Sequence, residues 1–142
     1  MGYYRALHRH LFQDVYDWAG EIRTIRIGKA GNWFCYPEYI KPELDTLFAS
    51  ADQQDWFKGL SAAPFARGVA GFLAHLNAMH PFREGNGRTQ IALLSILTDL
   101  SGFAFNDDVL VPDRVLQAMV ESFSGDDGKL TELVAGLIAL QS

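Results

Sequence analysis

The stretch HPFREGNGRTQ, residues 80–90, lies between two apolar helical segments, and the rest of the chain is interpreted outward from it. It places a histidine, a carboxylate, two glycines and an arginine in one short loop. Gly85 and Gly87 lack a Cβ and let the backbone turn closely against a ligand. A helix that begins at such a loop offers unpaired N–H groups and its positive dipole end to an anion. The stretch therefore indicates a site for phosphate chemistry.

The polar side chains of this loop each suit that chemistry. His80 has an ordinary pKa of about 6.5 and can accept a proton near neutral pH. Glu84 offers a hard oxygen ligand of the kind that Mg²⁺ prefers. Arg88 carries a forked guanidinium for phosphate oxygens, and Asn86 can donate its side-chain amide to the same anion. Together these groups predict a nucleotide-transfer site.

Two other phosphate-binding loops do not fit this sequence. A Walker A loop needs a lysine after its last glycine, whereas Arg88 follows Gly87. The dinucleotide fingerprint needs a third glycine where Gln90 stands, and a strand ahead of Gly85. An ordinary surface loop is the simplest alternative, but so many suited groups in so few positions favour a functional site.

Residues 80–88 resemble the signature of the Fic domain family, H-x-F-x-[D/E]-G-N-G-R-x-x-R. Residues 11–24 resemble the family's helix-to-flap entry, and residues 102–133 are similar to its C-terminal helices. The resemblance implies one domain over residues 1–142, with an all-α, compact helical fold and an active-site loop at 80–88. It also implies one small β-hairpin, the flap, at about residues 22–36.

The chain departs from that signature at one position, since the second arginine is replaced by Ile91. Arg88 and residue 91 are an i, i+3 pair on the first turns of a helix, so both would face one phosphate chain. The resemblance implies that the missing arginine would hold the outer phosphate of ATP and orient the α-phosphate. Two interpretations stay open: a conservative change in an apolar helix, or a disabled or altered donor site.

The resemblance implies a protein adenylyltransferase, which moves AMP from ATP to a Ser, Thr or Tyr hydroxyl of a target protein with Mg²⁺ bound. It assigns the catalytic base to His80 and the metal ligand to Glu84. It assigns nucleotide binding to the rest of the loop: Arg83, Gly85, Asn86, Gly87 and Arg88. It assigns the part of the flap that docks the target to Ile27, Gly28 and Lys29.

Alternatives to this function also follow from the resemblance. One is a catalytically weak Fic-fold module that binds a nucleotide or a partner protein, and another is a transferase that uses UTP, GTP or a choline-bearing nucleotide. Many Fic proteins are inhibited by a helix with the motif [S/T]-x-x-x-E-[G/N], which this sequence lacks. The resemblance therefore implies a small antitoxin protein that supplies the helix, or no such inhibition. Ile91 would remove the arginine with which that glutamate pairs.

Composition limits the class of protein. A chain of 142 residues with 49% hydrophobic residues is long enough for one domain with a real core. Its net charge of −5 argues against non-specific binding to nucleic acid. The lone Cys35 excludes an internal disulfide and a cysteine-rich zinc site. No apolar run reaches membrane-spanning length and no signal peptide is evident, so we expect a cytoplasmic protein.

Helical periodicity predicts most elements. One apolar stripe ends at Gly20 and consists of Tyr4, Leu7, Leu11, Val15 and Trp18. A second is opened by Pro64 and consists of Phe65, Val69, Phe72, Leu76 and Met79. The small residues Ala70, Gly71 and Ala74 predict that this second helix lies in the middle of a bundle. Further helices are expected at 42–48, 112–123 and 130–140.

A β-hairpin is expected between the first helices, with strands at 22–27 and 33–36 and a turn at 28–32. An unpaired hairpin edge can bind an extended peptide through its main chain and so present a target hydroxyl to His80. The alternative is a hairpin that only covers the core.

Other conspicuous residues receive simpler interpretations. The tryptophans are expected to be packing residues: Trp18, Trp33 and Trp56. His8 is not expected to bind metal, and His75 is interpreted as a surface or hydrogen-bonded residue. The acidic pairs at 107–108 and 126–127 are expected to be solvated turn carboxylates.

Overall fold

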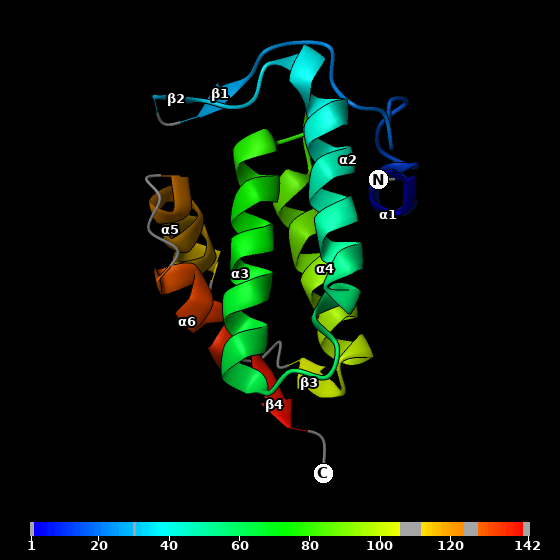
Figure 1. Ribbon diagram of the computed structural model, residues 1–142. Helices are drawn as coiled ribbons and strands as arrows, with labels where there is room; N and C mark the ends of the chain where they lie inside the picture. The colour runs from blue at the N-terminus through cyan, green and yellow to red at the C-terminus, as the bar shows by residue number, and fades with distance from the viewer. Residues whose placement is uncertain (1, 30, 106–111, 124–127, 141–142) are drawn as a thin grey trace.

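A computed structural model describes residues 2–29, 31–105, 112–123 and 128–140 of the chain (Figure 1). The helices are α1 (Gly2–Phe12), α2 (Pro37–Gln53), η1 (Asp55–Phe57), α3 (Ala62–Met79), α4 (Asn86–Leu100), α5 (Pro112–Phe123) and α6 (Gly128–Leu137). The strands are β1 (Gly28–Lys29), β2 (Asn32–Trp33), β3 (Phe103–Phe105) and β4 (Ile138–Leu140). The acidic pairs at 107–108 and 126–127 lie outside the described residues. The helices dominate, and the all-α prediction is confirmed.

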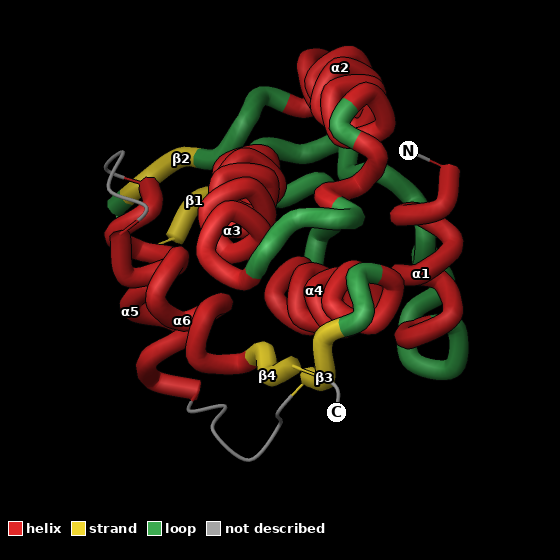
Figure 2. Tube along the Cα trace, turned by 60° about the horizontal axis from the view of Figure 1, so that its bottom comes forward, coloured by secondary structure: helices red, strands yellow, loops and turns green. Residues whose placement is uncertain are grey.

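Helix α3 lies in the middle of the bundle, with α2 and α4 on one side and α5 and α6 on the other (Figure 2). The five residues of its predicted stripe are all buried, from Phe65 to Met79. Ala70 is also fully buried. At Gly68 an added Cβ would lie 2.7 Å from the Phe57 ring, so the missing side chain admits a close neighbour. The central placement predicted for this helix is confirmed.

Helix α1 buries only part of the predicted stripe, since Tyr4 is buried and Leu7 packs against the core. Its buried residues are Tyr4, His8 and Phe12, spaced by one turn. The helix ends at Phe12, and Leu11 and Val15, which were predicted to point inward, are 41% and 68% exposed. The stripe prediction left out His8, which is buried because both of its ring nitrogens are hydrogen-bonded inside the protein.

Helix α2 begins earlier than predicted. We expected it to start at Pro42, but Pro37 occupies the first helical position and Pro42 lies inside the helix. Pro37 fits that position because the first N–H groups of a helix have no partner within it. The buried residues of α2 are Ile40, Leu44, Phe48 and Ala51, so its apolar face extends on both sides of Pro42.

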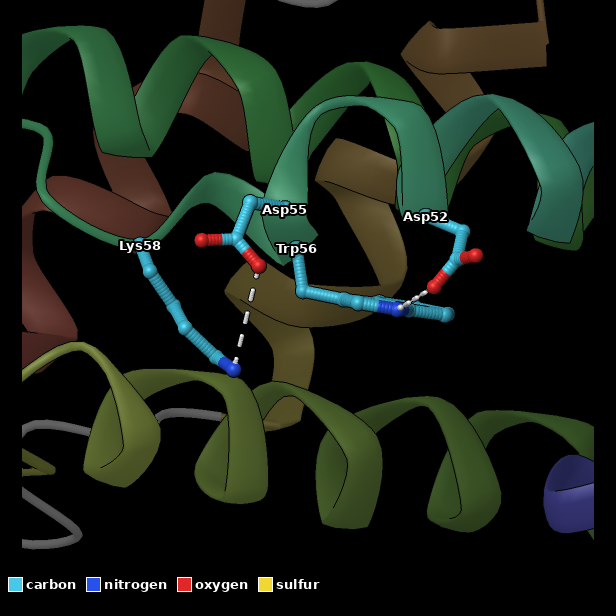
Figure 3. A network of polar contacts seen from close by, with 4 residues as sticks. All are labelled: Asp52, Asp55, Trp56 and Lys58. Carbon is cyan, nitrogen blue, oxygen red and sulfur yellow. Dashed lines mark hydrogen bonds and ion pairs between the residues drawn. The ribbon is translucent and has the colours of Figure 1, made fainter.

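A left-handed turn follows α2. Asp55, Trp56 and Phe57 have φ of 51°, 54° and 64°, a region that non-glycine residues rarely occupy. The Trp56 Nε1–H donates to Asp52 Oδ1 at 3.2 Å, and Lys58 Nζ lies 4.0 Å from Asp55 Oδ1 (Figure 3). Trp56 is half-buried and packs against the core, as predicted for this tryptophan.

The flap is an antiparallel hairpin in which Gly28 pairs with Trp33 and Lys29 with Asn32. The predicted strand at 22–27 is wrong, because this segment has no strand pairing in the structure. Its β-branched residues suggested a strand, but Arg23 within it is buried and donates to backbone carbonyls of other segments. The predicted turn at 28–32 is also wrong, because β1 and the first residue of β2 lie within it. Of the predicted strand at 33–36 only Trp33 is paired.

A second two-stranded sheet was not predicted. Strand β3 pairs antiparallel with β4, from Phe103 opposite Leu140 to Phe105 opposite Ile138. The last helix was expected to continue through residue 140, whereas α6 ends at Leu137. Strands this short carry no recognisable alternation, and this pairing joins distant parts of the chain. No helix in the described ranges is long and apolar enough to cross a membrane.

Candidate active site

His80 ends helix α3 in a left-handed conformation, with φ of 43°. Its backbone N–H donates to Leu76 O at 3.0 Å, and its ring Nδ1 lies 2.6 Å from Asn77 O. A carbonyl oxygen can only accept a hydrogen bond, so Nδ1 carries the proton. In the neutral ring the lone pair is therefore on Nε2, where a general base would need it.

The flap touches the His80 ring directly. Phe34 stacks on it with ring centroids 3.6 Å apart and planes 7° apart. Side chains alternate along extended backbone, and Phe34 is buried against His80 while Trp33 is 61% exposed on the other face. Because Trp33 is exposed, the prediction that it is a packing residue is wrong. Through Phe34, the flap covers one face of the His80 imidazole.

Arg23 links the flap to the end of α3, and sequence analysis did not identify it. Its side chain is buried, with 2% of its surface exposed. Its guanidinium donates to four backbone carbonyls: His80 at 2.6 Å, Met79 at 2.9 Å, Cys35 at 2.6 Å and Ile25 at 2.7 Å. Two of these carbonyls end α3 and two belong to the flap. One side chain thus holds both.

Burial lowers the pKa of the Arg23 guanidinium, which nevertheless stays charged because an arginine titrates so far above neutral pH. The last carbonyls of a helix are the negative end of its dipole and favour a cation. No signal in the sequence pointed to this role, since an arginine inside an apparent strand is usually on its solvent face.

The loop after His80 is fixed from inside by Asn86. Its side chain is buried, accepts from Phe82 N at 3.1 Å and donates to Phe82 O at 2.7 Å. We expected this amide to face an anion, and the structure turns it to the loop backbone instead. Gly85 has φ of 82°, and an added Cβ would lie 2.4 Å from the Phe12 ring. Both features require glycine there.

The amino end of α4 is open to an anion. The helix begins at Asn86 with no side-chain cap, and its first internal bond runs from Thr89 N to Gly85 O at 3.0 Å. The N–H groups of residues 86–88 therefore have no helical acceptor. Gly87 lies within this turn, and a Cβ there would meet no atom within 4 Å. Its missing side chain leaves the backbone accessible.

The charged side chains of the loop are on the surface. Arg83 and Arg88 are exposed and lie over aromatic rings, 5.5 Å from the Trp18 ring centroid and 5.9 Å from that of Phe12. Glu84 is also exposed. A single carboxylate suits Mg²⁺ that takes its other ligands from water and phosphate. Within the described ranges no three His, Cys, Asp or Glu side chains gather as metal ligands.

His8 supports the loop at 80–88 through a hydrogen bond, although no role was predicted for it from the sequence. Gly20 N–H donates to Nδ1 at 2.9 Å, so the ring proton is on Nε2, which donates to Glu84 O at 2.9 Å. The ring stacks on Phe82 with centroids 3.8 Å apart. His8 is fully buried, and burial lowers its pKa. A neutral histidine therefore joins α1, the Gly20 turn and the active-site loop.

Position 91, where the signature's second arginine would stand, lies on the second turn of α4. Ile91 is half-buried there, and the preceding Gln90 is fully buried. Arg88, one turn earlier, is exposed. In this chain only the first of the two signature positions offers a cation to the amino end of the helix.

The protein is a helical domain in which a histidine ends α3. A few residues later in the sequence, the open amino end of α4 can accept an anion. Residues 2–98 match the family model described as Fic/DOC family. The chain belongs to the Fic/DOC family, and the predicted family membership is confirmed.

Relatives of this chain support the same assignment. The chain is 52% identical over 137 residues to the probable protein adenylyltransferase y4lH of Sinorhizobium fredii, covering 96% of this chain and 71% of that protein. It is 32% identical to the probable protein adenylyltransferase Fic of Escherichia coli, covering 91% of this chain and 63% of that relative. Among solved structures, BepC of Bartonella tribocorum with bound AMPPNP superposes with a TM-score of 0.88 at 25% identity, covering 99% of this chain and 75% of that one.

Proposed function

We propose that this protein is an adenylyltransferase that moves AMP from ATP to a hydroxyl side chain of a target protein. The observation that carries the proposal is the His80 ring, whose Nδ1 is committed to Asn77 O, so that Nε2 keeps the lone pair of the neutral ring. The loop that follows His80 leads directly into the amino end of α4. The names of the two adenylyltransferase relatives and the nucleotide bound to BepC support it.

The reaction would proceed by in-line attack. The target's Ser, Thr or Tyr oxygen attacks the α-phosphorus of ATP, and its proton passes to His80 Nε2. The bond between the α-phosphorus and the oxygen bridging to the β-phosphate breaks, and pyrophosphate leaves. The stack of Phe34 on the imidazole, with centroids 3.6 Å apart, keeps the ring in one orientation for this transfer.

The amino end of α4 would stabilise the phosphates. The backbone N–H groups of Gly87 and Arg88, with the helix dipole, face developing negative charge. The Arg88 and Arg83 guanidinium groups, both exposed, extend this site toward the outer phosphates. Asn86 would act by holding the loop through Phe82, and Gly85 by allowing the turn that starts the helix.

Glu84 is the residue that would hold Mg²⁺. Its carboxylate is exposed, and its backbone is fixed by the hydrogen bond from His8. When bound, Mg²⁺ neutralises phosphate charge and so favours departure of pyrophosphate.

The flap would dock the target. Gly28 and Lys29 form β1, and Ile27 precedes it, its carbonyl accepting from Phe34 N at 3.1 Å. Residues of a short hairpin can pair with an extended segment through main-chain groups. Because Phe34 contacts His80, a segment bound along the flap would bring its hydroxyl near the base.

Labelled ATP tests this function directly. The chain, His80→Ala and His75→Ala are each incubated with ATP, Mg²⁺ and a cell lysate, and label on protein is counted. His75 lies exposed on the same helix and makes a matched control. We expect His80→Ala to lose at least about 100-fold in transfer, as for loss of a positioned base, and His75→Ala to match the parent chain. Equal labelling by all three would exclude His80 as the base.

A second candidate function rests on Ile91. A module with one phosphate arginine could bind nucleotide or a partner and transfer slowly. Ile91→Arg distinguishes the two: a large gain in transfer is expected from a weakened enzyme, while unchanged transfer shows that a second arginine is dispensable here. Calorimetry with ATP, UTP and GTP in the presence of Mg²⁺ identifies the donor and shows whether the site binds one.

Regulation and location complete the proposal. A small antitoxin protein would supply an inhibitory helix to this site, and the protein would act in the cytoplasm. Native mass spectrometry of the chain isolated from its own cells tests the first point, with a bound small protein as the expected result. A chain that is isolated alone and fully active would contradict it.

A further inference from the structure

The outer face of the flap carries an arginine held against two aromatic rings. The Arg26 Cζ lies 4.7 Å from the Trp33 ring centroid and 3.9 Å from that of Tyr36, and Nη1 donates to Tyr36 Oη at 2.9 Å. These three residues, here called the flap cluster, are all exposed, Trp33 by 61% and Tyr36 by 46%. Exposed tryptophan, tyrosine and arginine are the residue types that dominate binding hot spots.

The Arg26 guanidinium retains an unused donor edge. Nη1 is bound to Tyr36, while across the described part of the chain no group accepts a hydrogen bond from Nε or Nη2. These two atoms form the fork that matches both oxygens of a carboxylate. The two rings and the Tyr36 hydroxyl restrict the side chain before any ligand arrives, which lowers the entropy lost on binding.

Charge on the flap favours an acidic ligand. The flap at 22–36 contains Arg23, Arg26 and Lys29 and no acidic residue, and Glu21 and Glu38 flank it. Arg23 is occupied by backbone carbonyls, so the flap cluster holds a cation that is both ordered and accessible. The guanidinium of Arg26 is therefore complementary to a carboxylate.

The position of the flap cluster relates it to the reaction. In the sequence, Phe34 lies between Trp33 and Tyr36, and its ring stacks on the His80 ring. Phe34 faces inward and Trp33 outward, so a ligand on the cluster lies across the flap from the base. When the hydroxyl of a target segment reaches His80, target residues several positions away from that hydroxyl would lie along this outer face of the flap.

We propose that the flap cluster binds an aspartate or glutamate side chain of the target protein, a few residues from the acceptor hydroxyl, and thereby selects among targets. This inference rests on the proposed transfer to protein hydroxyls. Arg26 would receive the carboxylate through Nε and Nη2, and Trp33 and Tyr36 would pack against the neighbouring target residues.

A peptide series tests the binding step without ATP. Each fluorescent peptide carries one central threonine in a neutral background, with a single glutamate moved from position to position, and a glutamine peptide serves as reference at every position. Anisotropy gives the ratio of the two dissociation constants. We expect glutamate to bind roughly 3- to 10-fold more tightly over a narrow range of positions, as for a forked but exposed charge pair.

Three variants assign that preference to the cluster. Arg26→Gln should abolish the glutamate preference, and Arg26→Lys, which keeps the charge without the fork, should leave a weaker one. Arg67→Gln removes an exposed arginine of α3, far from the flap in sequence, and should keep the full preference. A parent chain with no glutamate preference, or an Arg26→Gln variant that retains it, would overturn the proposal.

Three further results distinguish carboxylate binding from a purely structural role of the cluster and from adenylyl transfer itself. If the cluster only stiffens the hairpin, Arg26→Gln will lower thermal stability and leave the glutamate to glutamine ratio unchanged, which overturns the proposal. His80→Ala should retain the ratio because it changes the base and not the cluster. A parent chain that shows the ratio yet labels no peptide with ATP would overturn adenylyl transfer and leave the carboxylate site standing.

Discussion

At the scale of single residues, two buried polar side chains hold the site together from outside the signature. Arg23 joins the flap to the end of α3 through four carbonyls. His8 joins Gly20 to the Glu84 carbonyl through its two ring nitrogens. The positions of His80 and Glu84 therefore depend on two buried residues that lie outside the loop at 80–88.

Replacing Arg23 should destabilise the protein strongly. Arg23→Gln removes a buried cation from four carbonyl acceptors, and we expect a loss of about 2–4 kcal/mol in the free energy of unfolding. Arg23→Lys should lose less, since it keeps the charge but cannot reach all four carbonyls. Urea unfolding at neutral pH measures both. Arg67→Gln on the surface is the control, and a loss no larger than its own would refute the role.

His8 should make stability depend on pH. Burial lowers its pKa in the folded state, whereas the unfolded chain titrates at about 6.5. Above that pH the ring is neutral in both states and its full contribution is present. As the pH falls below about 6.5, the unfolded chain takes up a proton that the folded protein resists, so stability drops until the lowered folded pKa is reached. Below it, His8 adds no further slope.

Urea unfolding between pH 8 and pH 5 measures this dependence, with His8→Phe as the comparison. The phenylalanine keeps a ring on Phe82 but does not titrate. We expect the parent chain to lose up to about 1.4 kcal/mol per pH unit more than the variant inside this window. Parallel curves for the two proteins would show that His8 is not responsible.

At the scale of elements, the amino end of α4 contains two glycines with different reasons to be there. Gly85 has a positive φ and faces the Phe12 ring, while Gly87 is in regular helix with open space around it. The first glycine is required by the fold. The second weakens the helix and leaves its backbone N–H groups accessible.

The paired substitutions Gly85→Ala and Gly87→Ala should therefore act in opposite directions. Gly85→Ala should cost about 1–3 kcal/mol, because its Cβ meets Phe12 and its φ is unfavourable for alanine. Gly87→Ala should stabilise the fold by about 0.5–1 kcal/mol and weaken ATP binding through its added methyl. Calorimetry gives unfolding and ATP affinity for each. Tight ATP binding by Gly87→Ala would show that the ligand does not approach this amide.

At the scale of the whole molecule, α3 packs against most of the other helices and ends at His80. It packs against α2, α4, α5 and α6, and its buried stripe belongs to one continuous core cluster. A defect in that core should therefore appear everywhere at once.

Leu76→Ala tests this coupling. Leu76 is fully buried and its carbonyl accepts from the His80 N–H at 3.0 Å. We expect a loss of about 2–5 kcal/mol from the cavity, with coincident unfolding curves by circular dichroism and by tryptophan fluorescence. Separate transitions for the two probes would mean that the domain is not one cooperative unit.

The sequence predicted those features that depend on local pattern. The buried stripe of α3 and the start of α5 at Pro112 follow from helical spacing and proline preference. The loop at 80–88 was recognisable from its chemistry, and the Fic family assignment is confirmed. Its residue roles stay predictions.

Features in which a buried polar group finds its hydrogen-bond partner far away in the sequence could not be predicted. Arg23 and His8 are buried because distant carbonyl and N–H groups meet them, and no local pattern records those partners. The pairing of β3 with β4 joins segments far apart in the chain. Arg26 and Trp33 form their exposed contact only once the hairpin turns.

The close parallel stack of Phe34 on His80 has a magnetic consequence. At a centroid separation of 3.6 Å the imidazole protons lie within the ring current of the phenyl group, and their resonances should be displaced upfield from those of an ordinary histidine. Movement of the flap away from His80 would return them downfield toward ordinary positions at any pH, whereas protonation would move them downfield only as the pH falls. One pair of resonances thus reports both where the flap is and whether the base holds its proton.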